Sequence, residues 1–338
     1  MRCTRLDHFV RFNPNGTVSR CGHMADPPQF ATLADMDSSA WLQNIRHQFE
    51  QDQWPAECVR CQDTETITGT SIRLNSLQDH EHRSRDDYLQ VAGVLDNICN
   101  SACQFCDETL STKIGSLKSP RGYVIYDNSS RFDSLPQERI TWLDISGGEP
   151  SASKNYKRLL DNLPPNLEAI RVNTNAALLL PQLERINQSG VRVTVTISFD
   201  GIGPVHDYNR WPIPWDTFMA NVRAYESYDL YDLNFWTTVN VLNIMDLDNI
   251  LAFMGENGFN HSWSLLDWPP ALNIKYSNTF TRAARDKYAN STNPELRNLA
   301  ELVASGADNQ DHLDEYIRQA DQLRGICIDD YLTKHYLK

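Results

Sequence analysis

The sequence contains no run of 18 apolar residues, and its N-terminus, MRCTRLDHFVRF, lacks the apolar region of a signal peptide. Membrane-spanning helices and secretory signals depend on such stretches. Internal repeats and low-complexity tracts are absent too. We therefore predict a soluble cytoplasmic protein that has no membrane partner.

Basic residues are also scarce. The chain has 31 Lys and Arg against 44 Asp and Glu, a formal charge of −13, and no basic stretch. Binding along a phosphate backbone depends on clustered cations, so we predict no non-specific binding to nucleic acid. Apolar residues at 41% and charged residues at 22% are ordinary globular values. A chain of 338 residues can form one large α/β domain with a smaller appendage.

Eight cysteines are many for a cytosolic chain, where metal or cluster ligands are commoner than disulfides. Three of them, Cys99, Cys103 and Cys106, form a Cys-x3-Cys-x2-Cys loop after a short apolar run. Thiolates at this spacing can converge on three irons of a cubane [4Fe–4S] cluster. No fourth ligand is apparent in the loop, so one iron would stay open for a small molecule. A loop of reduced thiols or a partial zinc site is the alternative.

The loop resembles that of the radical S-adenosylmethionine (SAM) superfamily, including Asn100 after the first cysteine and Phe105 before the last. The resemblance implies that the open iron binds the amino and carboxylate groups of SAM. It also implies that an electron, from a donor such as flavodoxin or ferredoxin, cleaves SAM to methionine and a 5′-deoxyadenosyl radical. That radical then abstracts hydrogen from a substrate.

Strand-like runs alternate with amphipathic segments downstream, as in βα units around a parallel sheet. The predicted strands cover residues 91–97, 140–146, 169–174, 191–199, 233–241 and 260–266. The predicted helices between them cover residues 155–163, 181–189, 215–228 and 246–257. Six units are the number in the partial (βα)6 TIM-like barrel of radical SAM enzymes. Such barrels place their chemistry at the C-terminal ends of the strands, where the distinctive residues fall here.

A glycine turn follows the second predicted strand, as Ser146-Gly147-Gly148-Glu149-Pro150. Glycines let the backbone approach a ligand closely. The turn is similar to the family's GGE motif, which contacts the methionyl amino group of SAM. On this interpretation, the missing side chain of Gly148 leaves room for the methionyl end. Gly-Gly-Glu-Pro is also common in turns that bind nothing.

Polar residues end the next two strands. The stretch from Ser198 to Arg210 resembles the S-x-D-G…R stretch of family members with a SPASM domain, in which polar side chains approach the ribose or carboxylate of SAM. The candidate SAM-contacting residues here are Asn175, Ser198, Asp200 and Arg210. Each could instead cap a strand end. We expect His206 to be a solvated loop residue rather than an acid or base.

The segment 1–85 contains four more cysteines: Cys3, Cys21, Cys58 and Cys61. Alternating residues around Asn15-Gly16 predict a β-hairpin that brings the first two together, followed by a helix over 39–49. The Cys-x2-Cys knuckle formed by the last two can supply two ligands to one centre. The spacing is similar to that of SPASM and twitch domains, which hold an auxiliary [4Fe–4S] cluster but mostly follow the barrel. A four-cysteine zinc site is the alternative.

Residues 269–338 are expected to form polar helices over 282–289, 294–304 and 311–323, which cover the open side of the barrel or pack on the N-terminal segment. Here the eighth cysteine, Cys327, is either an inert thiol or a hydrogen-atom donor. The predicted parts are therefore an auxiliary-cluster segment (1–85), a barrel (86–268) and a helical extension (269–338).

The predicted function is that of an oxygen-sensitive radical SAM enzyme. Its substrate is a peptide or protein or, alternatively, a small metabolite, sugar or nucleotide. A zinc-stabilised binding protein without catalysis and a redox carrier with two clusters are the hypotheses from other functional classes.

Overall fold

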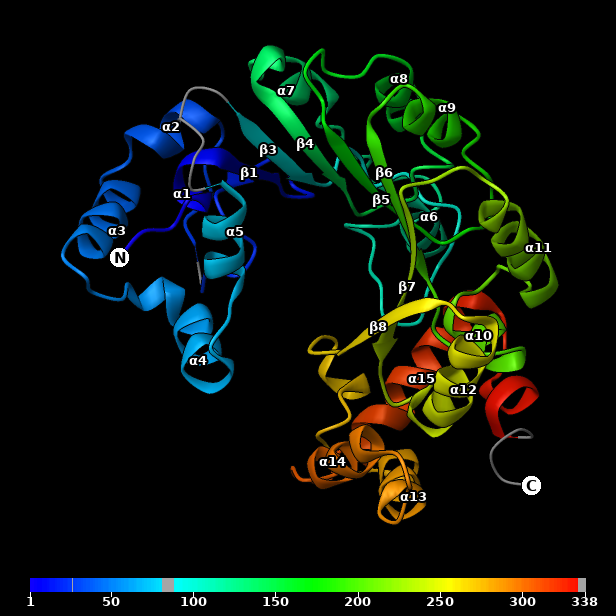
Figure 1. The fold of residues 1–338 in the computed structure, drawn as a ribbon. Helices are drawn as coiled ribbons and strands as arrows, with labels where there is room; N and C mark the ends of the chain where they lie inside the picture. The colour runs from blue at the N-terminus through cyan, green and yellow to red at the C-terminus, as the bar shows by residue number, and fades with distance from the viewer. Residues whose placement is uncertain (26, 81–87, 334–338) are drawn as a thin grey trace.

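The computed structural model describes residues 1–25, 27–80 and 88–333. The centre of the structure is one sheet of eight strands, in the order β2-β1-β3-β4-β5-β6-β7-β8, which curves into an arch (Figure 1). The strands are β1 (Phe9–Phe12), β2 (Val18–Ser19), β3 (Leu89–Gly93), β4 (Ile140–Ile145), β5 (Ala169–Thr174), β6 (Arg192–Ser198), β7 (Asp232–Val239) and β8 (Asn260–Leu265). All neighbours pair in parallel except β1 and β2, which are antiparallel.

Strands β3 to β8 are the six predicted strands, so the predicted partial (βα)6 barrel is confirmed. The helices that accompany them are α6 (Thr112–Lys118), α7 (Ser129–Asp133), α8 (Lys154–Asp161), α9 (Gln182–Gln188), α10 (Pro204–Asn209), α11 (Trp215–Glu226) and α12 (Leu247–Asn257). The four helices predicted in this part correspond to α8, α9, α11 and α12. Helices α7, α8, α9 and α11 lie on the outer side of the arch (Figure 1).

Alternation along each strand determines which face is buried. On β4, Leu143 and Ile145 belong to the main apolar core under the outer helices, whereas Trp142 and Asp144 line a cavity on the inner face. Ser153 caps the N-terminus of helix α8, because its hydroxyl accepts hydrogen bonds from the N–H groups of Asn155 and Tyr156. The sheet therefore has an apolar outer face and a polar inner face.

The N-terminal segment contributes α1 (Arg5–His8), α2 (Leu33–Ser38), α3 (Ala40–Glu50), α4 (Val59–Thr68) and α5 (Ile72–His80). The predicted hairpin is confirmed as β1 and β2, with a loop wider than two residues because Phe12 and Val18 are its last pair. The helix predicted over 39–49 corresponds to α3, and Ser39 caps it. Strand β1 also pairs with β3, so the segment shares the barrel's sheet. The boundary predicted after residue 85 lies outside the described residues.

The C-terminal extension forms α13 (Thr279–Tyr288), α14 (Pro294–Leu302) and α15 (Gln310–Arg324), which confirms the three predicted helices. They share a second apolar core with α10 and the ends of β7 and β8. No described residue of the segment 1–80 belongs to that core. In the described part of the chain, no helix has both the length and the apolar character needed to cross a bilayer.

Candidate functional site

The three-cysteine loop runs from the end of β3 to α6 and lines a cavity of about 240 Å³ at the C-terminal edge of the sheet. Most of the other residues around this cavity come from the turn after β4 and from the ends of β5 and β6, and Arg210 follows α10. The lining comprises Cys99, Ser101, Cys103, Phe105, Cys106, Leu110, Gly147, Gly148, Glu149, Asn173, Thr174, Asn175, Ser198 and Arg210. The structure thus brings together all the predicted residues of this site except Asp200 and Cys327.

The environment of Cys99 and Cys106 disfavours thiolates without a cation. Burial raises the pKa of Cys99 to about 11 and also raises the pKa of Cys106, and the neighbouring Cys103 adds to both effects. The Ser101 hydroxyl lies 3.5 Å from Cys99 Sγ and 3.4 Å from Cys103 Sγ. A cationic metal centre would supply the charge that three neighbouring thiolates need, so the donor set fits an iron–sulfur cluster.

The glycine turn packs directly against the cysteine loop. Gly148 has φ +55°, and a Cβ placed there would lie 2.6 Å from the Asp96 carbonyl oxygen and 2.9 Å from that of Ile98. The Glu149 N–H donates to the same Ile98 carbonyl at 2.7 Å. The reason given above for this glycine is therefore wrong. Its missing side chain admits the backbone of the cysteine loop, rather than the methionyl end of SAM.

We accordingly expect Gly148→Val to displace the cysteine loop. A β-branched residue at positive φ is strained by about 1–3 kcal/mol, and here it would also collide with backbone atoms. Iron bound per chain after anaerobic reconstitution should fall severalfold. Gly258→Val is the matched control, because Gly258 has φ +68° but open space around its Cβ position. Full iron content in Gly148→Val would contradict this account.

Glu149 links the turn after β4 to the end of β5. Its carboxylate is fully buried and accepts hydrogen bonds from the Ser151 hydroxyl at 2.6 Å, the Thr174 hydroxyl at 2.8 Å and the Asn175 N–H at 2.7 Å. Burial raises the pKa of Glu149, while these donors oppose that shift. The Asn175 amide then donates to the Asn100 side chain at 2.8 Å. Glu149 therefore orients Asn175 at the cavity wall.

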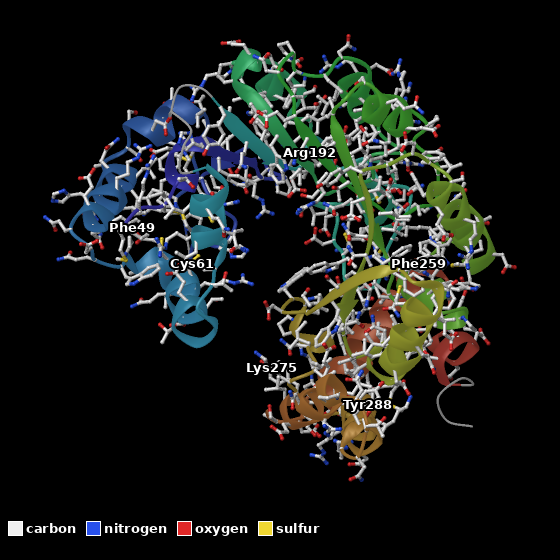
Figure 2. The ribbon with its side chains drawn as sticks, in the orientation of Figure 1. Phe49, Cys61, Arg192, Phe259, Lys275 and Tyr288 are labelled. Atoms are coloured by element: carbon white, nitrogen blue, oxygen red, sulfur yellow. The ribbon has the colours of Figure 1, made fainter. Side chains whose placement is uncertain are left out.

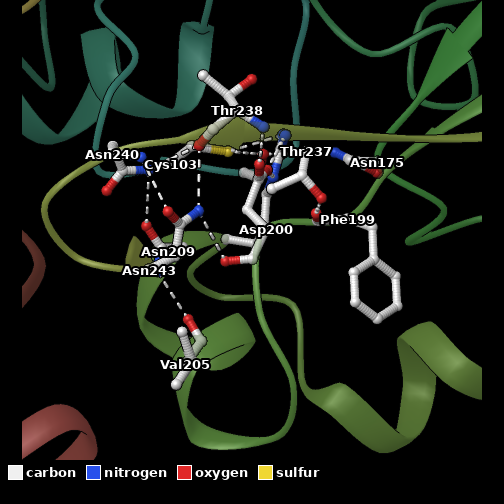
Figure 3. Close-up of polar contacts among 12 residues, drawn as sticks. Cys103, Asn175, Phe199, Asp200, Val205, Asn209, Thr237, Thr238, Asn240 and Asn243 are labelled. Carbon is white, nitrogen blue, oxygen red and sulfur yellow. Dashed lines mark hydrogen bonds and ion pairs between the residues drawn. The ribbon is translucent and has the colours of Figure 1, made fainter. Parts of the chain in front are cut away.

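Asp200 lies behind the cavity wall rather than in it. It is fully buried, forms an ion pair with Arg210, and accepts from the Thr238 N–H at 2.7 Å (Figure 3). The Arg210 guanidinium donates to Cys103 Sγ at 3.5 Å and stands 5.2 Å from the centre of the Phe105 ring. The prediction that Asp200 itself approaches SAM is therefore corrected, because its carboxylate instead positions the Arg210 cation beside the thiol.

Two other predicted residues lie away from this cavity. His206 is fully buried on α10, against Trp215 and Phe218, so the expectation of a solvated loop histidine is wrong. Burial lowers the pKa of His206 to about 3, which keeps the ring neutral. Cys327 is exposed after α15 and does not line the three-cysteine cavity.

Helix α15 holds the cysteine loop in place through hydrogen bonds from outside the barrel. Arg324 is 8% exposed and donates from Nε to the Ala102 carbonyl at 2.7 Å and from Nη2 to the Cys103 carbonyl at 2.9 Å. The Tyr316 hydroxyl donates to the Gln104 carbonyl at 2.6 Å. Neither residue was predicted from the sequence. On a helix, a polar residue that contacts a distant loop occupies the same kind of position in the helical pattern as a polar residue that faces water.

We expect Arg324→Met to loosen the loop. The change removes the two hydrogen bonds that a charged donor gives to the loop, each contributing about 1.5–3 kcal/mol, and leaves the Cys103 carbonyl with only the Cys106 N–H among the described residues. Iron should be lost severalfold faster to a chelator than from the parent. Arg318→Met on the same helix is the control, because Arg318 is exposed and pairs only locally with Glu315. Identical rates of iron loss in both variants would contradict a bracing role.

The other four cysteines meet at a second, smaller cavity in the N-terminal segment. Cys3, Cys21, Cys58 and Cys61 all line it, together with His23. Burial and then the neighbouring Cys21 raise the pKa of Cys3 to about 12, and burial also raises that of Cys61. The hairpin and the knuckle thus converge as predicted, and four thiols are a donor set that iron–sulfur clusters and zinc sites both use.

Charged residues line this second cavity and form hydrogen bonds and ion pairs around it. Arg73 lines it and is held by a 2.6 Å ion pair with Glu65, and it also donates to the Arg2 carbonyl at 2.8 Å. Glu57 accepts from the Trp41 indole at 2.9 Å. Among the described residues, no three His, Cys, Asp or Glu side chains are close enough together to hold a single metal ion. A cubane needs thiolates that are farther apart, because its irons occupy different corners.

The chain is similar to a curated protein, the mycofactocin maturase MftC of Mycolicibacterium smegmatis, with 23% identity over 191 residues. The match covers 56% of this chain and 47% of MftC, so the chain spans about half the length of the curated relative it matches. The cysteine loop and glycine turn of the family meet at one cavity at the C-terminal edge of a six-unit barrel. These findings support a radical SAM superfamily enzyme. No family model matches it.

Solved structures similar to this chain include SuiB of Streptococcus suis bound to S-adenosylmethionine, with 14% identity and a TM-score of 0.43 over 84% of this chain and 68% of SuiB. Native anSMEcpe with bound AdoMet and the Cp18Cys peptide has 16% identity and a TM-score of 0.40, over 71% of this chain and 62% of its own. Values this low assign no residue a role.

Proposed function

We propose that this radical SAM protein cleaves SAM reductively at a [4Fe–4S] cluster held by Cys99, Cys103 and Cys106, and abstracts hydrogen from a substrate. The observation that carries the proposal is the single cavity that these thiols share with the glycine turn and with residues at the ends of β5 and β6. When bound, the cluster would supply the electron that splits SAM into methionine and a 5′-deoxyadenosyl radical.

The residues of the chain would bind and orient the cofactor. The Gly147-Gly148 turn offers backbone groups at the cavity wall, and Asn175 and Ser198 offer side-chain polar atoms for the amino, carboxylate or ribose groups of SAM. Arg210 holds a positive charge beside Cys103. Glu149, whose oxygens already accept hydrogen bonds from the chain, keeps Asn175 in place. The buried walls exclude water from the reacting atoms.

The further parts of the proposal concern the substrate and the second centre. The similarity to a maturase favours a peptide or protein substrate, and a small metabolite, sugar or nucleotide is the alternative. Cys3, Cys21, Cys58 and Cys61 would hold an auxiliary [4Fe–4S] cluster in the segment 1–85, beside the barrel of 86–268 and the extension of 269–338. A flavodoxin or ferredoxin of the cytoplasm would donate the electron.

Anaerobic metal and sulfide analysis, combined with a SAM-cleavage assay, tests this function. Two clusters predict about eight irons and eight sulfides per chain, brown protein that bleaches in air, and formation of 5′-deoxyadenosine with a strong reductant. Colourless protein with bound zinc and no SAM cleavage would instead establish a non-catalytic, zinc-stabilised protein. Iron without SAM cleavage would establish a redox carrier.

A further inference from the structure

The inner face of the sheet contains a large polar cavity that the proposed chemistry does not use. It has a volume of about 680 Å³ and lies against the first halves of β3 to β6, with α1 and α5 of the N-terminal segment on its other side. The aromatic ring of Trp142 forms part of its wall.

Arginines dominate the charge of this cavity. Arg5, Arg171 and Arg192 line it, against the two carboxylates of Asp144 and Glu168. Burial raises the pKa of Asp144, while Arg171, Arg5 and Arg11 oppose the shift, so three cations lie within electrostatic reach of this one carboxylate. Because the whole chain has a charge of −13, this net positive surface is a local reversal of sign.

Among the described residues, nothing accepts a hydrogen bond from the guanidinium of either arginine on the sheet, so these donors are available to a ligand. The Arg171 guanidinium stands 3.8 Å from the Asp144 carboxylate and its side chain is 49% exposed. Arg192 lies over the Tyr231 ring at 5.7 Å (Figure 2 labels Arg192 on the sheet). These residues start from neighbouring strands on the same face, because Arg192 is paired with Ala169, two residues before Arg171. Guanidinium groups placed in this way bind carboxylates with paired hydrogen bonds.

The cavity lies between the two cysteine sites. Arg5 and Ile72 line both this cavity and the four-cysteine cavity. On its other side, Asn173 lines the three-cysteine cavity and donates to the Asp144 carboxylate at 3.4 Å. A molecule bound along the inner face would therefore reach from one cysteine site towards the other.

The spread of the arginines argues for an extended ligand. Arg5 stands 3.6 Å from the centre of the Phe9 ring on β1, and Arg192 is on β6. These two strands are four strand spacings apart in the sheet order, which is about 19 Å between their backbones. A single compact anion cannot span that distance. A peptide with several carboxylates can place one carboxylate on each side of Asp144.

We propose that this cavity binds an acidic peptide segment, with its carboxylates held by Arg171 and Arg192, and that this segment belongs to the substrate. That the bound segment belongs to the substrate rests on the proposed radical SAM function. That the cavity binds an acidic peptide concerns binding alone and can be tested without SAM chemistry.

The test uses fluorescein-labelled decapeptides of equal length whose variable positions are all Glu, all Gln or all Lys, with anaerobically prepared full-length protein. We expect the Glu peptide to bind, with affinity that falls as salt rises, and the Gln and Lys peptides to bind far more weakly. The double variant Arg171→Gln/Arg192→Gln should weaken the Glu peptide about tenfold or more. Arg185→Gln on α9, where Arg185 pairs with Asp161, is the control and should bind like the parent.

Equal binding of the Glu and Gln peptides would overturn the proposal, as would unchanged affinity in the double variant. ATP and inorganic phosphate serve as competitors. Displacement of the Glu peptide by ATP at lower concentrations than by the unlabelled peptide would assign the cavity to a phosphate ligand and would also overturn it. A parent that cleaves SAM but binds no Glu peptide disproves this site alone. A parent that binds the Glu peptide without cleaving SAM disproves the proposed function alone.

Discussion

Replacing Cys99, Cys103 and Cys106 together with Ala is expected to remove about four irons per chain and to abolish 5′-deoxyadenosine formation. All three thiols line the cavity that contains the glycine turn, and none lines the four-cysteine cavity. The loss should therefore be confined to one of two clusters. Iron and sulfide analysis measures the first effect, and chromatography of the SAM-cleavage reaction measures the second.

Cys327→Ala is the control for this experiment. Cys327 is exposed and lies outside both cysteine cavities, so its removal should leave the iron content and SAM cleavage at parental values. Far-ultraviolet circular dichroism should show that the triple variant retains its fold, since the loop is also held through Arg324 and Tyr316. Retained SAM cleavage in the triple variant would disprove the assignment of the catalytic cluster.

Cys58→Ala/Cys61→Ala is expected to remove the other four irons while SAM cleavage with a strong artificial reductant continues. A cluster with four cysteine ligands has no open iron for a substrate, so electron transfer and stiffening of the segment are the roles left to it. Zinc would have been sufficient for stiffening alone. We therefore expect the double variant to fail in converting its true substrate, as measured by mass spectrometry of the product.

The spectrum of the barrel cluster should be unchanged in this double variant, because the two cavities share no residue. Thermal unfolding should separate a loss of stability from a loss of electron transfer. The knuckle adjoins apolar residues of the N-terminal core such as Leu6 and Phe49, so some destabilisation is expected. Full substrate turnover in the variant, or zinc rather than iron in the anaerobically prepared parent, would contradict the proposed auxiliary cluster.

Local patterns in the sequence determined much of this protein. The six barrel strands were predictable because alternating apolar residues mark each one independently of its neighbours. The helix over 39–49 was predictable for the same reason, since apolar residues at helical spacing mark it locally. The three-cysteine loop could be assigned to a cluster because all its ligands lie within eight consecutive residues.

The tertiary structure decided the features that depend on pairs of distant residues. The pairing of β1 with β3, the brace from Arg324 to the cysteine loop and the placement of Asp200 behind Arg210 leave no periodic signal in the sequence. His206 was expected to be a solvated loop residue, but α10 buries it against aromatic rings. Gly148 shows the same limit. A sequence can reveal that a glycine is present, but only the fold shows that the backbone of residues 96–98 occupies the space its side chain would need.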